Sequence, residues 1–158
     1  MRKMILPAAI GFITGAVITV VAGISIAPGM MITENVSSLS FDETVEALTE
    51  ATEDAGWKIP KIHQIDVSVS QDGYDVLPVT VIEVCNPDLA GTILEDDDAR
   101  VVSSMMPCRI AVYERTDGTV VVSRMNTGLM SGMFGGLVKS TMADATDDTE
   151  RIIASVLN

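Results

Sequence analysis

The sequence contains few of the residues that common catalytic and metal sites require. Its 158 residues include two cysteines and one histidine. There is no C-x-x-C-H haem-attachment motif and no paired C-x-x-C spacing of a zinc site, so any bound haem would have to be non-covalent. The G-x-S-x-G, H-E-x-x-H and P-loop motifs are also absent, which disfavours the hydrolases and nucleoside triphosphatases that carry them.

Positive charge is also scarce. The chain has 10 lysines and arginines against 22 aspartates and glutamates. All the acidic residues and 8 of the basic ones lie in residues 34–158, which gives this part a formal charge of −14. Such a surface repels nucleic acid and anionic lipid headgroups, so we expect no nucleic-acid partner. The same surface could attract cations or a basic partner, or it could simply be a solvated acidic surface.

Charge is absent altogether between Lys3 and Glu34. Within this stretch two prolines bracket residues 8–27, a run of 20 residues. A helix of that length measures about 30 Å, the thickness of the hydrocarbon core of a bilayer. A cleaved signal peptide is the competing interpretation, but the run exceeds the usual ~7–15-residue apolar region and no clean A-x-A cleavage site follows it. We therefore expect one N-terminal transmembrane helix that stays attached.

Arg2 and Lys3 are the positive charges that flank this segment. Positive flanks stay on the cytoplasmic side of a membrane. The sequence therefore predicts a single-pass protein of the cell membrane with a cytoplasmic N-terminus and a domain on the periplasmic or extracellular side. The predicted organisation is a membrane anchor over residues 1–33 and an extracytoplasmic domain over residues 34–158.

The predicted anchor carries small residues spaced by four, at Gly11, Gly15, Thr19 and Gly23. Such a ladder lines one face of a helix and lets a second helix approach closely. Transmembrane helices are often rich in glycine, so an unpaired helix is the alternative. These four residues are the candidates for packing within the membrane.

The clearest element of the domain is a helix over residues 40–56. Ser40 and Glu43 form an S-x-x-E capping box, apolar residues follow at helical spacing, and Gly56 suits the C-terminal cap. The preceding segment ITENVSSL is a candidate first strand.

Two further strands are predicted from apolar patterning. HQIDVSVS (63–70) alternates, which places His63 on the apolar face with every second residue after it. VLPVTVIEVCNP (76–87) is apolar on both faces, as a central strand would be. PDLAGTILEDDDA then predicts a short helix with Pro87 at its start and the aspartates in the following loop.

The last third of the chain predicts a hairpin and a helix. CRIAVYER (108–115) alternates, TDG (116–118) is typical of a hairpin turn, and TVVVSRMN is the return strand. GLMSGMFGG is a glycine-rich, apolar link, and a final amphipathic helix runs to about Leu157. This order predicts an α+β domain, an antiparallel sheet with helices packed on one face.

The segments EVCNPDLAGTILEDD, MMPCRIAVYERTDG and MNTGLMSGMFGG, in this order of elements, resemble the family catalogued as domain of unknown function 302. The resemblance covers roughly residues 34–158, and its most specific features are Cys-Asn-Pro at 85–87 and Pro-Cys at 107–108. It implies a small α+β fold like one half of the TATA-binding protein, usually found as a homodimer. It implies no established reaction.

The two cysteines are the first candidates for a site. Cys85 ends one predicted strand and Cys108 begins another, so we expect Cys108 to face the interior near Cys85. Three outcomes are open. The pair could form a disulfide, as is usual outside the cytoplasm; it could be two buried inert thiols; or it could bind a metal jointly.

Methionines cluster around the second cysteine. Thioether and thiolate sulfur select Cu(I) or haem iron over hard cations. A plastic core or a dimer surface would use the same methionines, and His63 could be a ligand or a satisfied, partly buried ring. The candidate ligand-binding residues are Cys85, Cys108, His63, Met105, Met106, Met125 and Met130, with the two cysteines as metal ligands.

Two functions from different classes fit these observations. The first is a membrane-anchored binding module that holds a soft metal such as Cu(I), a non-covalent haem or a sulfur compound. The second is a non-catalytic accessory subunit that pairs through its anchor and its GLMSGMFGG surface with a larger membrane complex. A third, weaker hypothesis is a thiol–disulfide enzyme. A nucleophilic pair of either cysteine with His63 is disfavoured, because an unactivated cysteine would oxidise in this compartment.

Overall fold

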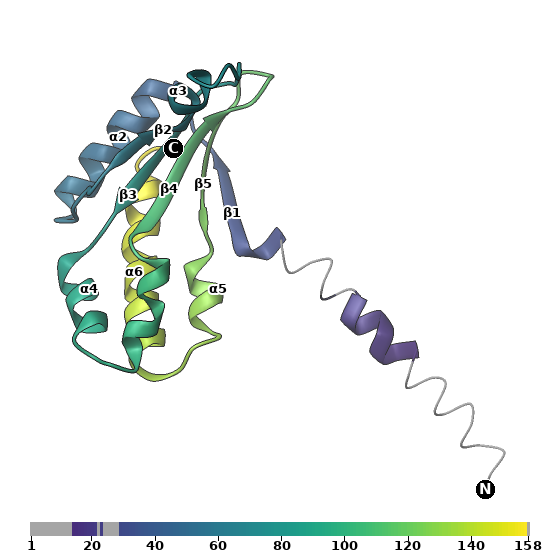
Figure 1. The fold of residues 1–158 in the computed structure, drawn as a ribbon, viewed down its shortest axis with the longest axis vertical. Coiled ribbons are helices and arrows are strands. Elements are labelled where there is room, and N and C mark those ends of the chain that lie inside the picture. Colours follow the sequence, from purple (N-terminus) through teal and green to yellow (C-terminus); the bar gives the residue numbers. More distant parts are fainter. Residues whose placement is uncertain (1–13, 22, 24–28, 158) are drawn as a thin grey trace, which may run out of the picture.

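A five-stranded antiparallel sheet organises the computed structural model, in which residues 14–21, 23 and 29–157 are described (Figure 1). The strand order across the sheet is β1-β5-β4-β3-β2. The strands are β1 (Ile32–Val36), β2 (Ile62–Gln64), β3 (Val79–Val84), β4 (Cys108–Glu114) and β5 (Val120–Met125). The helices are α2 (Phe41–Asp54), α3 (Ile65–Ser70), α4 (Pro87–Leu94), the 3-10 helix η1 (Ala99–Met105), α5 (Thr127–Ser131) and α6 (Gly136–Ala154). The predicted α+β fold with an antiparallel sheet is confirmed.

The hydrophobic core lies between one face of the sheet and two helices. Register pairs Ile82 of β3 with Ile110 of β4, and Val122 of β5 shares their face. These three side chains are fully buried against Leu48 of α2 and Ile153 of α6. In Figure 1, α6 lies behind the strands. Each such side chain contributes roughly 1.5–3 kcal/mol by leaving water, so this layer holds the sheet and both helices together.

The helix predicted after Ser40 is confirmed as α2, and its capping box forms. The backbone N–H of Ser40 donates to Oε2 of Glu43 at 3.1 Å. The hydroxyl and the backbone N–H of Ser40, which both donate to this carboxylate, lower the pKa of Glu43. Gly56 follows the helix with φ of 76°, a left-handed conformation that glycine adopts without strain.

The hairpin predicted at residues 116–118 joins β4 to β5. Arg115 donates its backbone N–H to the carbonyl of Thr119 at 2.9 Å. Gly118 has φ of 80°, which favours glycine at this position of the turn. The local signal was sufficient here because the turn lies within five residues.

The predicted strand over residues 63–70 is wrong after Gln64. β2 ends there, and the next six residues form α3. A longer strand has no partner, because β3 begins at Val79, directly after Pro78, whose nitrogen carries no hydrogen to donate. None of the residues of α3 is buried, so the apolar alternation of this segment does not mark a core face.

The segment predicted as a glycine-rich link begins with a short helix. Oδ1 of Asn126 accepts the backbone N–H of Leu129 at 3.0 Å and caps α5. α5 is held to α6 by a hydrogen bond of 2.7 Å between the hydroxyls of Thr127 and Thr146. This segment is therefore fixed to the domain surface.

The predicted membrane span, residues 8–27, falls partly outside the described part of the chain, and Gly11 is among the residues that are not described. Among the described residues, no helix combines the length and the apolar composition of a membrane span. Residues 14–21 are helical, and the hydroxyl of Thr19 donates to the carbonyl of Gly15 at 2.9 Å. The anchor and its packing face therefore stay predictions.

Candidate functional site

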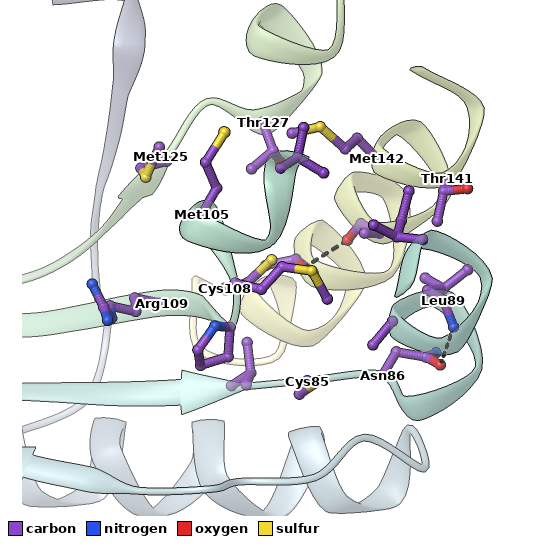
Figure 2. A pocket seen from close by; sticks show the side chains of 18 of the residues that line it. Cys85, Asn86, Leu89, Met105, Cys108, Arg109, Met125, Thr127, Thr141 and Met142 are labelled. Carbon is purple, nitrogen blue, oxygen red and sulfur yellow. Dashed lines mark hydrogen bonds between the residues drawn. The ribbon is translucent and has the colours of Figure 1, made fainter. Parts of the chain in front are cut away.

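One end of the sheet borders a cavity of about 270 Å³ (Figure 2). It lies where β3 ends, β4 begins and β5 ends, and residues of α4, η1 and α6 supply its other walls. Its lining is mostly apolar. The volume lies just below the ~300–1,000 Å³ of typical small-molecule sites, so this cavity suits a small ligand.

The sheet register brings both cysteines to this cavity. Cys108 is the first residue of β4 and pairs with Val84, the last residue of β3. Cys85 follows at once, and two backbone hydrogen bonds of 2.8 and 2.9 Å hold it to Lys58. The chain then turns away into α4, which Asn86 caps. Figure 2 shows the two cysteines at neighbouring strand ends.

Both cysteines are free thiols. Burial raises the pKa of the Cys108 thiol, and negative charge on Cys85 raises it further. Burial also raises the pKa of the Cys85 thiol. Both groups are therefore neutral at physiological pH, whereas nucleophilic cysteines have a lowered pKa. This argues against a thiol–disulfide enzyme.

Methionine sulfur adds to the lining. Met105, Met106 and Met125, three of the predicted ligands, line the cavity with the cysteines. Met142 of α6, which was not among the predicted ligands, joins them across the cavity (Figure 2). Met130 lies on α5 and is not among the lining residues.

His63 lies on the face of the sheet opposite the one that packs against α2 and α6. Its register partner is Val81, which alternates with the buried Ile82 and so points away from α2 and α6. Nε2 of His63 is 3.1 Å from Oε1 of Glu83, and Arg109 approaches the same oxygen at 3.6 Å. His63 therefore does not lie on the apolar face beside the cysteines. Its pairing with Val81 of β3 turns its side chain away from the core.

The cavity wall also contains a buried arginine that the sequence did not predict. Arg124 of β5 is 7% exposed. Its Nε donates to Oε1 of Glu150 at 2.8 Å, its Nη2 donates to the other oxygen, and its Nη1 donates to Oδ1 of Asn35 at 2.5 Å. Its position in the predicted strand could have indicated burial, because it lies two residues after the inward-facing Val122 and so shares its face. A charged side chain on a buried face needs a partner of opposite charge.

One protein-family model matches nearly the whole domain of this chain. The family described as Domain of unknown function DUF302 matches residues 32–157. The chain belongs to the DUF302 family. A crystal structure of an uncharacterized conserved DUF302 protein from Bacillus stearothermophilus is similar, with a TM-score of 0.72 and 23% identity over 80% of this chain and 98% of that chain. The comparison with curated proteins found no match.

The donor set of this DUF302 domain restricts the metals that its cavity could hold. Within the described ranges, no group of three or more histidine, cysteine, aspartate or glutamate side chains is placed to hold a metal ion. The sulfur donors that line the cavity are the two cysteines and methionines such as Met105 and Met106. Sulfur ligands of this kind suit soft ions rather than calcium or magnesium.

Proposed function

We propose that this DUF302 chain is a non-catalytic binding module that holds a soft, thiophilic ligand in its cavity. The observation that carries the proposal is that Cys85 and Cys108 line one mostly apolar cavity together with four methionines. Thiol and thioether sulfur select soft ligands. The raised pKa values of both thiols disfavour nucleophilic chemistry.

Among the candidate ligands, Cu(I) suits the donor set best. A haem would have to fit a cavity of about 270 Å³ with no histidine in its lining. A small sulfur compound suits that volume, but it leaves the methionines without a role as ligands. We therefore take Cu(I) as the first ligand to test.

We also propose that residues 8–27 attach the domain to the outer face of the cell membrane. The support is the uncharged run between Lys3 and Glu34 and the two positive charges before it. The family resemblance adds two predictions, a homodimer and a fold like one half of the TATA-binding protein.

Copper binding tests the proposed function. Reduced protein is titrated with Cu(I) in competition with a chromophoric Cu(I) chelator. We expect Met105→Leu to weaken Cu(I) binding by about 10-fold or more, since even outer partners of metal ligands contribute 10–100-fold. Met130→Leu is the matched control, because that methionine lies outside the cavity lining, and it should bind as the wild type does.

Absence of Cu(I) binding, or equal loss in the two methionine variants, would contradict this function. A chain that binds no copper and co-purifies with other membrane subunits would support the accessory-subunit hypothesis instead.

Copper affinity should also rise with pH. Burial raises the pKa of both thiols, so each cysteine must release a proton before its thiolate can bind the metal. Below those raised pKa values, affinity is expected to increase by about tenfold per pH unit for each proton released. Competition titrations at several pH values measure the slope. A flat profile would show that no thiolate forms on binding.

A further inference from the structure

Six exposed apolar side chains lie on β1, β5, α5 and α6 or directly beside them, on the elements around the point where the chain enters the domain. Met133 is 81% exposed, and five others are between 39% and 47% exposed. They come from the start of β1 and the residue before it, the end of β5, α5, the turn that follows α5 and the start of α6. We call the set the entry face: Met31, Ile32, Met125, Leu129, Met133 and Leu137.

Asn126 ties the entry face to the incoming chain. Its Nδ2 donates to the carbonyl of Met30 at 3.0 Å, and its backbone N–H donates to the carbonyl of Met31 at 2.8 Å. Its Oδ1 accepts the backbone N–H of Leu129 at 3.0 Å. One side chain therefore holds the first turn of α5 against residue 30 of the incoming chain. Figure 1 shows the chain reaching β1 on the side of the domain that carries β5 and α5.

The link to the apolar N-terminal segment is short. That segment ends at Ala27, three residues before Met30. Three residues of fully extended chain span at most about 11 Å. Met30, which Asn126 holds beside the start of α5, therefore lies within about 11 Å of the end of residues 8–27.

Four of the six entry-face residues, Met125, Leu129, Met133 and Leu137, come from an uncharged stretch of a domain that is otherwise strongly acidic. No charged residue occurs between Arg124 and Lys139, although residues 34–158 carry a formal charge of −14. An apolar, uncharged surface enters the interface of a bilayer at low cost, while the acidic remainder stays in water.

We propose that the entry face rests on the lipid bilayer, with its methionine, leucine and isoleucine side chains among the headgroups. The proposal rests on the membrane attachment proposed above. The partner is a zwitterionic lipid surface, since the acidic domain repels anionic headgroups. The cavity lies beside this face, because Met125 belongs to both. The ligand site is thereby held close to the membrane surface.

Quenching of tryptophan emission by brominated lipids tests the proposal. The full chain is reconstituted into phosphatidylcholine vesicles with brominated acyl chains. The natural Trp57 is 3% exposed in the core and supplies a constant background. Met133→Trp probes the entry face, and Tyr74→Trp is the matched control. Tyr74 is 67% exposed and follows α3, at the opposite end of the domain from α5 (Figure 1).

We expect the emission added by Met133→Trp to fall about twofold or more, because an interfacial side chain lies ~5–10 Å deep, within reach of the bromines. Emission added by Tyr74→Trp should not change. If both probes are unquenched while the chain floats with the vesicles, the entry face does not touch lipid, although the anchor holds. If the chain does not float with the vesicles, the proposed membrane attachment fails, and this inference fails with it.

Discussion

Truncating Ile110 to alanine is expected to lower the free energy of unfolding by about 2–5 kcal/mol. Ile110 is fully buried on the face of β4 that α2 and α6 cover, in one cluster with Leu48 and Val84. The variant loses the transfer free energy of the removed methyl and methylene groups, and it leaves a cavity that rigid neighbours cannot fill. Because domains are stable by only about 5–15 kcal/mol, this is a large share of the total.

Denaturant unfolding followed by circular dichroism measures the effect. Val101→Ala is the control, since this valine of η1 is 72% exposed, and its truncation should change stability by no more than about 0.5 kcal/mol. Equal losses in the two variants would show that the cluster around Ile110 is not the stabilising core.

Replacing either Cys85 or Cys108 with serine is expected to weaken Cu(I) binding by at least about 100-fold. Outer partners of metal ligands already contribute 10–100-fold, and a direct sulfur ligand should contribute more. A serine hydroxyl has nearly the shape of a thiol but is a hard donor that Cu(I) binds poorly. Since both cysteines line the same cavity, the double variant should lose less than the sum of the two single losses.

The competition titration measures these affinities on reduced protein. Unfolding curves of the same variants check that the domain remains folded, because Cys108 packs against the core cluster. Strictly additive losses would mean that the two sulfurs do not share one ion. Unchanged Cu(I) affinity in both single variants would show that neither cysteine is a ligand.

Local signals in the sequence predicted most of the secondary structure. The capping box of Ser40 and Glu43 acts within one turn of helix, and the turn at Gly118 acts within five residues. Such short-range chemistry is fully present in the sequence. The error at residues 65–70 has the opposite cause. Alternation alone suggested a strand, but a strand needs a partner, and β3 offers none beyond its start at Val79.

The sequence also indicated part of the candidate site. It pointed to Cys85 and Cys108 because one ends a strand and the other begins the next strand of an antiparallel sheet. It pointed equally to His63 and Met130, which the structure keeps away from the cavity. Residue type identifies a sulfur or imidazole donor, but it does not say toward which face of the sheet that donor points.

By itself, the sequence determined the fold class, the hairpin, the main helices, the acidic charge and the two uncharged segments. All of these depend on residues that are neighbours along the chain. Only the tertiary structure decided which donors share a cavity, that Arg124 is buried against Glu150 and Asn35, and that Asn126 holds α5 against residue 30. Those contacts join residues between 26 and 96 positions apart, and sheet register and helix packing bring them together.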